Sequence, residues 1–425
     1  MRPLFYYGWV VVAVATFAMF AATLTGGAGF SVFIAPMSKD LGWSRSVLAG
    51  ALSAGTIVGA LVAPFMGRLI DAYGARVVLT LCGAGVALTL TVVSGVTSEL
   101  TFVIAYGAAR AIDMGALNLS VSTVVANWFV RMRGRALGIA MTGNAVGVML
   151  LVPAIQWMID GPGWRPAWLI VGGGSGLVLM IGSAVLLRRR PEDIGLRPDG
   201  DAEPTALGGS VPDGTGASGT GLPTRVEADW TARQAVRSSS FWLLVLASCG
   251  SQMAVSGLTT HQAAILAENG LSPMAVAGAI GLYGLAWTVS ALVWGVLIER
   301  LSARVVLGIL SLLVAACCLG ALATRDPLML LVYVLAYGTS NGAKEALDSV
   351  VWSDYFGRRA AGAIRGLSRP FVVGSGAVGS FAGGVGYDLT GSYTVVVLVL
   401  AVMSLLGVVA SLAAVPPREP AMMPA

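Results

Sequence analysis

The stretch GRLIDAYGAR at residues 67–76 occurs a second time, in altered form, as GVLIERLSAR at residues 295–304. Both copies place an acidic residue four positions and an arginine nine positions after the first glycine, and they begin 228 residues apart in a chain of 425. Each copy is a short charged segment between long apolar runs. A repeat spaced at half the chain length predicts two equivalent halves, which is typical of secondary transporters.

The composition indicates a membrane environment. Hydrophobic residues make up 56% of the chain, charged residues make up 11%, and the mean hydropathy is +0.82. Soluble domains carry about 25% charged residues. Apolar runs of about 20 residues are long enough to cross a bilayer, and twelve such spans can be drawn. They are residues 9–36, 46–67, 76–97, 101–126, 136–159, 167–187, 241–266, 274–297, 304–323, 327–352, 362–386 and 393–415.

A long polar stretch divides these spans into two groups of six. Residues 189–237 include a run rich in Gly, Ser, Thr and Pro that cannot bury a core. We therefore expect an N-terminal six-helix bundle over 1–188, a cytoplasmic linker over 189–237 and a C-terminal six-helix bundle over 238–425. The predicted fold class is an all-α membrane protein with two pseudo-symmetric bundles that face each other across a central cavity.

Basic residues determine the predicted orientation. If the N-terminus lies inside, eighteen arginines fall in the inner segments. The basic residues in the outer segments are Lys39, Arg45, Arg165 and Arg325. This bias places both termini in the cytoplasm, and it explains the net charge of +5 without nucleic acid as a partner. The first apolar run is too long for a signal peptide, so we expect the first span to be retained.

Several motifs resemble a known family. A second pair of segments, WFVRMRGRALGIAMTGNAVG from Trp128 and YFGRRAAGAIRGLSRPFVVG from Tyr355, aligns at an offset of 227 and supports the duplication. GRLIDAYGAR resembles the loop 2–3 signature of the major facilitator superfamily, and GVLIERLSAR resembles its weaker second copy. Further segments resemble the branch of this superfamily that holds monocarboxylate transporters and oxalate/formate antiporters. They are YYGW at 6–9, DLGWSRS at 40–46, GWRPAW at 163–168, RRPEDIGLRPDG at 189–200 and YDLTGSY at 387–393.

The resemblance implies alternating access, in which the two halves rock about a site near the bilayer midplane, with spans 1, 4, 7 and 10 lining the cavity. It also implies that the paired motifs hold the cytoplasmic side together when the protein opens outward. The expected gating residues are Gly67, Asp71, Arg76, Gly295, Glu299 and Arg304. The alternative is that the arginines of these motifs only anchor the topology.

Charged and polar residues inside the spans are the candidates for substrate binding, because a charge at the bilayer centre costs about 2.5–3.5 kcal/mol. Span 4 places Arg110 and Asp113 on one helix face, with Asn118 further along. Span 10 carries a polar stripe made of Tyr337, Asn341, Lys344 and Asp348, with Glu345 at its edge. Both stripes should face protein or water.

Arg110 and Lys344 occupy corresponding spans of the two halves, so we expect them to bind an anion across the interface between the bundles. A guanidinium can hold a carboxylate with two hydrogen bonds, whereas an ammonium acts as a point charge. The alternative is that Arg110 pairs with Asp113, and Lys344 with Asp348, as internal salt bridges. Arg369 lies about two turns into span 11 and is a third candidate, since related transporters often use a basic residue there.

The intramembrane acids and the single histidine are candidates for proton coupling or charge pairing. They are Asp113, His261, Glu345 and Asp348. Carboxylates inside membranes carry protons in many pumps, and imidazole titrates near physiological pH. The alternative is that the acids only hold the basic groups in place and that the histidine is a hydrogen-bonded structural residue.

Span 8 departs from the branch that the chain resembles. Related transporters commonly hold the carboxylate with an arginine in this span, but residues 275–297 contain no charge. The polar candidates there are Tyr283, Trp287, Thr288 and Ser290. Either the anion is held by Arg110, Lys344 or Arg369, or the substrate is not a simple monocarboxylate.

We therefore expect a secondary transporter of a small organic anion, a carboxylate, driven by proton symport or anion exchange. It should act as a monomer in a bacterial inner membrane, without a cofactor or metal. The alternatives are proton-driven efflux of an amphipathic compound and a transporter-like sensor, although the linker and tail are too short for a signalling domain. One histidine and dispersed cysteines form neither a nucleophile–base pair nor a metal cluster, which argues against an enzyme.

Overall fold

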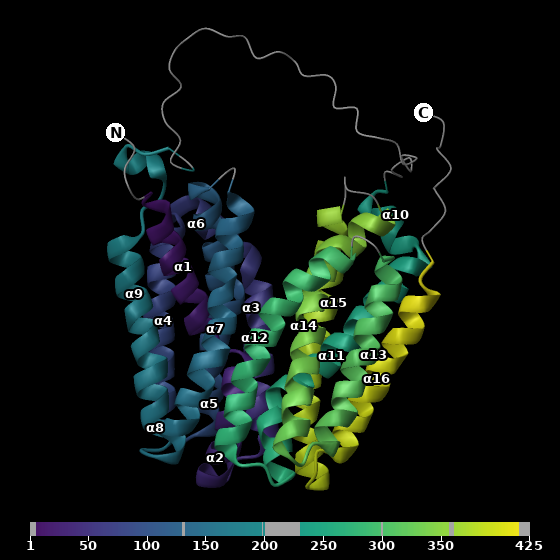
Figure 1. The fold of residues 1–425 in the computed structure, drawn as a ribbon. Helices are drawn as coiled ribbons and strands as arrows, with labels where there is room; N and C mark the ends of the chain where they lie inside the picture. The colour runs from purple at the N-terminus through teal and green to yellow at the C-terminus, as the bar shows by residue number, and fades with distance from the viewer. Residues whose placement is uncertain are drawn as a thin grey trace, which may run out of the picture.

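The computed structural model describes residues 6–129, 132–197, 199, 230–298, 301–356 and 361–415. Within these ranges, ten helical segments are long and apolar enough to cross a membrane. Two further helices of 30 residues each, α14 (Pro327–Phe356) and α15 (Ala361–Thr390), run beside them (Figure 1). No strand occurs in the described ranges. The predicted all-α membrane fold is confirmed.

The first half contains six spans, three of which are interrupted. Span 1 consists of α1 (Gly8–Ala22) and α2 (Gly27–Leu41), and spans 2, 3 and 5 are α3 (Arg45–Tyr73), α4 (Ala75–Ser94) and α7 (Arg133–Asp160). Span 4 consists of α5 (Glu99–Ile112), a π-helical turn at Asp113–Leu117 and α6 (Asn118–Trp128). Span 6 consists of α8 (Trp164–Ala167), a π-helical turn at Trp168–Gly173 and α9 (Gly174–Leu186).

The second half contains continuous helices. A short helix, α10 (Ala232–Arg237), precedes α11 (Ser239–Glu268), which is span 7. Spans 8, 9 and 12 are α12 (Pro273–Ile298), α13 (Ala303–Ala323) and α16 (Thr394–Ala413), and spans 10 and 11 are α14 and α15. The hydroxyl of Thr231 caps α10 by accepting a hydrogen bond from the backbone N–H of Gln234 at 3.3 Å.

Helix pairing is the same in both halves. In the first, α1 packs on α7, α3 on α5, and α4 on α9. In the second, α11 packs on α15, α12 on α14, and α13 on α16. In each half the first span therefore pairs with the fifth, the second with the fourth, and the third with the sixth. This correspondence is the pseudo-symmetry that the sequence repeat predicts.

The two bundles touch along α3 with α15 and along α7 with α12. Glycines permit this approach, since a methyl group at Gly284 of α12 would lie 2.7 Å from the carbonyl oxygen of Ala145, and one at Gly281 would lie 2.9 Å from that of Met149. Small residues allow membrane helices to pack closely in this way. Any larger side chain at these positions would push the bundles apart.

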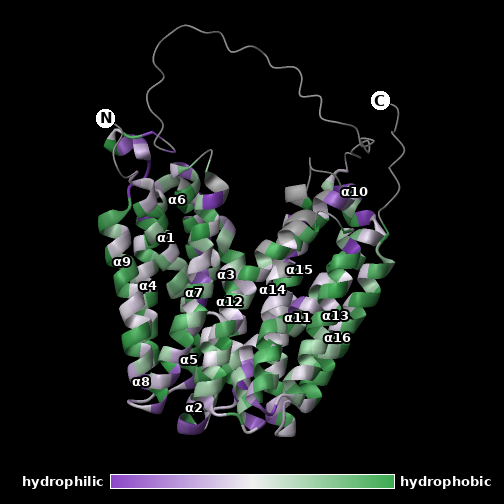
Figure 2. Ribbon diagram, viewed as in Figure 1, coloured by the Kyte–Doolittle hydropathy of each residue, from purple (hydrophilic) through white to green (hydrophobic). Residues whose placement is uncertain are grey.

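The bundles are close together at one end only. Figure 1 shows them farther apart at the end where α1 begins and α16 ends, which we call the terminal end, and close together at the opposite end, near α2 and α8. Figure 2 shows apolar residues along the length of the helices and hydrophilic ones gathered at the ends. Leu61, Leu88 and Leu328 are each at least 68% exposed, as expected of side chains that face lipid.

The first copy of the repeated motif is mostly helical, although the sequence predicted that span 2 ends at residue 67. Helix α3 continues through Gly67 and Asp71 to Tyr73, so that Gly74 alone separates it from α4. Gly74 has φ +83, a conformation that glycine adopts readily and other residues do not. Its counterpart Ser302 has φ −68, which suits any residue. The backbone therefore explains why only the first copy carries a glycine here.

Candidate functional site

A cavity of about 720 Å³ lies between the bundles. Both halves line it, and five of the six residues that the sequence proposed for substrate binding are among the lining residues. They are Arg110 and Asn118 from the first bundle and Asn341, Lys344 and Arg369 from the second. The sixth, Tyr337, is fully buried behind the wall, where its hydroxyl donates a hydrogen bond to the carbonyl of Val255 at 2.8 Å.

The first bundle contributes an ion pair to the cavity wall. Arg110 Nη1 lies 2.7 Å from Asp113 Oδ2, and its Nε donates to Thr56 Oγ1 at 3.1 Å. Asp113 is only 3% exposed. The same carboxylate accepts hydrogen bonds from Thr25 at 2.9 Å and from the Asn118 amide at 3.3 Å. The internal pairing of Arg110 with Asp113, which the sequence left open, is therefore present.

A π-helical turn sets the geometry of this pair. The backbone N–H of Asn118 bonds to the carbonyl of Asp113, five residues earlier, which turns the Asn118 side chain back toward the carboxylate. Such turns are rare and occur often at functional sites. Sequence periodicity did not reveal it. Gly115 is a partial sequence signal of the close packing at this turn, because a methyl group there would lie 2.8 Å from the carbonyl oxygen of Gly59 on α3.

The break in span 1 positions the remaining partner of Asp113. Because α1 ends at Ala22 and α2 begins at Gly27, Thr25 lies between them, with its hydroxyl on Asp113 and its carbonyl accepting a hydrogen bond from Tyr106 at 3.0 Å. Thr25 was not among the predicted site residues. The glycine-rich TGGAGF stretch at 25–30 signals the break but not the contact across the bundle.

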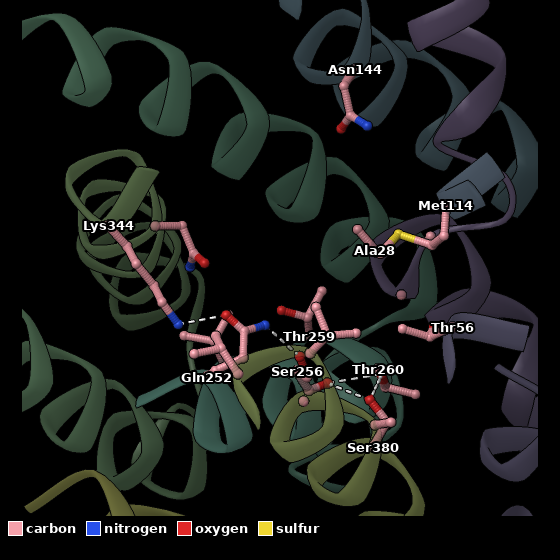
Figure 3. Close-up of a pocket in the computed structure, with 18 of the residues that line it drawn as sticks. Ala28, Thr56, Met114, Asn144, Gln252, Ser256, Thr259, Thr260, Lys344 and Ser380 are labelled. Carbon is pink, nitrogen blue, oxygen red and sulfur yellow. Dashed lines mark hydrogen bonds between the residues drawn. The ribbon is translucent and has the colours of Figure 1, made fainter. Parts of the chain in front are cut away.

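The second bundle contributes a chain of polar side chains. Lys344 Nζ donates to Gln252 Oε1 at 2.5 Å, and Gln252 Nε2 donates to Ser256 Oγ at 2.9 Å. Figure 3 shows these groups at the cavity surface, with Thr259, Thr260 and Ser380 beside them. Sequence reasoning missed Gln252, although an amide inside an apolar span is itself a signal of a polar partner.

Hydrogen bonds behind the surface hold this wall in place. Thr259 Oγ1 lies 2.6 Å from the Tyr337 hydroxyl, and Thr260 Oγ1 lies 2.9 Å from Ser380 Oγ. Since the Tyr337 hydroxyl donates to Val255, it accepts from Thr259. Tyr337 thus supports the cavity wall from inside the bundle and does not reach the cavity itself.

Two arginines of α15 line the part of the cavity near the terminal end. Arg365 is half-buried and Arg369 is exposed. Arg369 makes no hydrogen bond or ion pair with any residue that the structure describes. The side chains of Glu345 and Asp348, which the sequence proposed for proton coupling or charge pairing, lie outside the described residues.

His261 lies away from the cavity, fully buried between three helices. Its Nε2 is 2.9 Å from the carbonyl oxygen of Ser380, so this nitrogen is the protonated donor. Its Nδ1 is 3.1 Å from the Tyr393 hydroxyl and accepts a hydrogen bond from it. Both nitrogens of a neutral imidazole are therefore satisfied, which is the arrangement of a structural histidine.

A cluster around Arg45 joins the bundles at the end opposite the terminal end. Its guanidinium lies 3.1 Å from Glu268 and 3.5 Å above the ring of Tyr387. Asp388 accepts hydrogen bonds from the backbone N–H groups of Arg45 at 2.9 Å and Ser46 at 2.8 Å, at the start of α3. A carboxylate of the second bundle thus caps a helix of the first.

The described residues among those proposed for gating lie at the terminal end. Arg76 Nη2 donates to the carbonyl of Ala184 at 2.6 Å, which ties α4 to α9 within one bundle. Arg304 makes no hydrogen bond with a described residue. The side chain of Asp71, the surroundings of Gly295 and all of Glu299 lie outside the described residues. Among the described residues, the motif therefore makes no polar contact that joins the two bundles.

Comparisons with known proteins agree with this architecture. A family model, the Major Facilitator Superfamily, matches residues 12–377 and 262–424. Monocarboxylate transporter 9 of Rattus norvegicus is 28% identical over 180 residues, which cover 42% of this chain and 35% of that protein. The uncharacterized MFS-type transporter YcxA of Bacillus subtilis (strain 168) is 24% identical over 383 residues, covering 87% of this chain and 86% of its own.

Among solved structures, the nucleoside transporter NupG superposes with a TM-score of 0.71 at 14% identity, covering 95% of this chain and 99% of that one. This likeness concerns the fold. The chain aligns with only about a third of the length of the monocarboxylate transporters that it matches, 35% and 34% in two of them. Similarity of fold therefore extends over 95% of the chain, whereas sequence similarity to the monocarboxylate transporter of Rattus norvegicus covers 42% of it.

Proposed function

This chain belongs to the Major Facilitator Superfamily, and on that premise we propose that this transporter carries a small organic anion, a carboxylate, across a membrane by alternating access. The observation that supports an anion is the charge of the cavity. Its described lining residues include four basic side chains, Arg110, Lys344, Arg365 and Arg369, and one acidic side chain, Asp113. Basic side chains thus outnumber acidic ones among the described lining residues, which favours an anion in the cavity.

In the proposed complex, the carboxylate binds between the bundles. Lys344 supplies an ammonium beside the Gln252 amide, and Arg110 supplies Nη2, which has no hydrogen bond within the described residues. Asn118 and Asn341 line the same cavity and offer amide donors. Arg369 lies closer to the cavity entrance and attracts the anion as it enters. The similarity to monocarboxylate transporters favours a carboxylate over other anions.

We further propose that the terminal end faces the cytoplasm of a bacterium, as the excess of arginine there indicates. The described state then opens inward, with the Arg45 cluster closing the outer end. Transport requires this cluster to separate while the motifs of residues 67–76 and 295–304 come together. Energy comes from proton symport or from exchange against a second anion.

Binding to the purified full-length chain tests the proposal. Acetate, succinate and benzoate should raise the temperature of thermal unfolding, whereas choline should not. Lys344→Ala should greatly reduce the stabilisation at the same anion concentration. The matched control is Lys39→Ala, because the chain contains only these two lysines and Lys39 is exposed in the last turn of α2. If no anion stabilises the protein at any concentration short of precipitation, the anion proposal is wrong.

Uptake into proteoliposomes then separates the two sources of energy. Proton symport predicts uptake of labelled carboxylate that increases with an imposed pH gradient, acidic outside. Anion exchange predicts uptake that requires a carboxylate preloaded inside and does not respond to the gradient. Uptake that needs neither would contradict secondary active transport.

A further inference from the structure

We propose that the cavity is built for an aromatic carboxylate, whose ring stacks on Trp287 of α12 while its carboxylate binds beside Lys344. This inference rests on the proposed function and names a substrate class within it. It is carried by three features of the described residues: the size of the cavity, the aromatic wall of α12, and the rigid contact between α12 and α14.

The cavity is large for a simple monocarboxylate. Its volume of about 720 Å³ falls within the range of roughly 300–1,000 Å³ that is typical of sites for drug-sized ligands. An acid of two or three carbons would leave most of this space to water. A carboxylate that carries a ring fills more of the space and removes apolar wall surface from water.

The α12 wall is aromatic and uncharged. Residues 275–297 carry no charged side chain, and the rings that α12 presents to the cavity are Tyr283 and Trp287. Tyr283 stacks on the buried Tyr337 with ring centroids 5.2 Å apart, and Trp287 lies 6.1 Å from Tyr283. The row of rings therefore begins inside the bundle and ends at Trp287 in the cavity.

Trp287 is the ring most open to a ligand. Tyr283 is 4% exposed, whereas Trp287 is only partly buried. The indole Nε1 of Trp287 makes no hydrogen bond to any described residue. An aromatic face with an N–H donor at its edge suits a planar ligand that carries an acceptor.

The ring and the ammonium belong to one rigid pair of helices. A methyl group at Gly338 of α14 would lie 2.7 Å from the carbonyl oxygen of Tyr283 and 3.0 Å from the backbone nitrogen of Trp287. Lys344 follows two residues after Gly342, where a methyl group would lie 2.7 Å from the nitrogen of Ala291. The wall is therefore pre-organised, so little ordering is needed when a ligand binds.

Trp287 also lies where the bundles begin to separate. Three residues earlier, Gly284 packs against Ala145 and Val148 of α7. Val148 and Asn144 of α7 line the cavity beside this contact. Figure 3 shows the Asn144 amide across the cavity from Lys344. A ring placed on Trp287 would thus occupy the space between the two bundles, where alternating access requires the substrate to be.

Calorimetric titration of the purified full-length chain tests the inference with benzoate and cyclohexanecarboxylate, which have similar size and the same charge. Benzoate should bind about 2- to 12-fold more tightly, the advantage expected of an aromatic pair. Trp287→Leu should reduce this ratio to about one. Trp157→Leu is the matched control, because Trp157 is 69% exposed on the lipid-facing side of α7.

The outcomes separate this inference from the proposed function. If both acids bind but the ratio is one in wild type, or if the ratio survives in Trp287→Leu, the aromatic site is wrong and anion transport stands. If neither acid binds, the inference is wrong, and the proposed function fails as well only if acetate and succinate also do not bind. If benzoate preference disappears equally in Trp157→Leu, the effect is not specific to Trp287 and the inference is again wrong.

A second measurement does not depend on the stability of Trp287→Leu. In protein labelled with 5-fluorotryptophan, one of the eleven tryptophan signals should shift with benzoate but not with cyclohexanecarboxylate, because only benzoate carries a ring current. That signal should be the one missing from Trp287→Phe, which keeps an aromatic ring. A shift of any other signal alone would overturn the proposal.

Discussion

Arg110 of the first bundle and Lys344 of the second occupy corresponding spans and line the same cavity, yet they have different neighbours. Arg110 is joined to the buried carboxylate of Asp113 at 2.7 Å, and that carboxylate is in turn held by Thr25 and Asn118. Lys344 is bonded at 2.5 Å to Gln252, a neutral amide. A duplicated fold can thus keep its helix pairing while its halves carry different chemistry.

This difference suggests a division of labour between the bundles. The Arg110–Asp113 pair remains neutral when the cavity is empty, so it stabilises the interrupted helices around it at little cost inside a membrane. In the second bundle, Lys344 hydrogen-bonds the neutral amide of Gln252, and Arg369 has no partner among the described residues. We therefore expect losses in the first bundle to affect mainly stability, and losses in the second to affect mainly affinity.

The largest effect is expected for Arg110→Ala. Removing the guanidinium leaves the Asp113 carboxylate buried without its charged partner, which costs about 3–5 kcal/mol of unfolding free energy. The double variant Arg110→Ala/Asp113→Ala should recover most of that loss, because no unpaired charge remains. Thermal and denaturant unfolding of the purified chain in detergent would measure both. If Arg110→Ala alone were as stable as wild type, the ion pair would not contribute to stability.

The second largest effect is expected in the second bundle, at Lys344. Lys344→Ala should weaken carboxylate binding about 10- to 150-fold, the range for hydrogen bonds to charged groups, with a much smaller change in stability than Arg110→Ala produces. Lys344→Arg should restore part of the affinity, since the charge remains. If Lys344→Ala instead unfolds the protein as readily as Arg110→Ala, the two bundles do not differ in the way that their contacts suggest.

Much of this architecture is predictable from the sequence, because it depends on local patterns. The apolar runs and the repeat at 67–76 and 295–304 predict the spans and the two halves, and the three-residue spacing of Arg110 and Asp113 predicts a shared helix face. Periodicity cannot show where a helix loses its regularity. The π-helical turn at Asp113–Leu117 depends on contact with α3, so its effect on Asn118 was not foreseen.

Contacts between distant spans explain the other differences. Thr25 and Gln252 become site residues only because span 1 breaks beside span 4 and because α11 lies near α14. Tyr337 and His261 have the polar character of cavity residues, but their partners, Thr259 and Tyr393, hold them inside the second bundle. Sequence identifies which polar residues are in the membrane, whereas tertiary packing decides which of them reach the cavity.

The third effect concerns the repeated motif. Gly74 has φ +83 and ψ 153, and a methyl group at this position would lie 3.2 Å from the Arg189 side chain. Gly74→Ala should therefore cost about 1–3 kcal/mol of unfolding free energy. Ser302, its counterpart, has an ordinary backbone and no capping hydrogen bond. Ser302→Ala should therefore change stability by less than about 0.5 kcal/mol. Equal losses in the two variants would contradict the structural difference between the two copies.

The smallest effect is expected for Arg369→Ala. This side chain is exposed within the cavity, where water and salt weaken its field, so its removal should raise the KM for carboxylate uptake only about 2- to 5-fold. The difference from wild type should shrink as salt rises from 0.05 to about 0.5 M, because the Debye length falls below the distance over which an entering anion is attracted. Lys344→Ala should keep most of its effect at high salt, since its contact with Gln252 is short and partly buried. Equal salt dependence of the two variants would mean that both cations act at long range, and the second bundle would then contain no specific anion contact at Lys344.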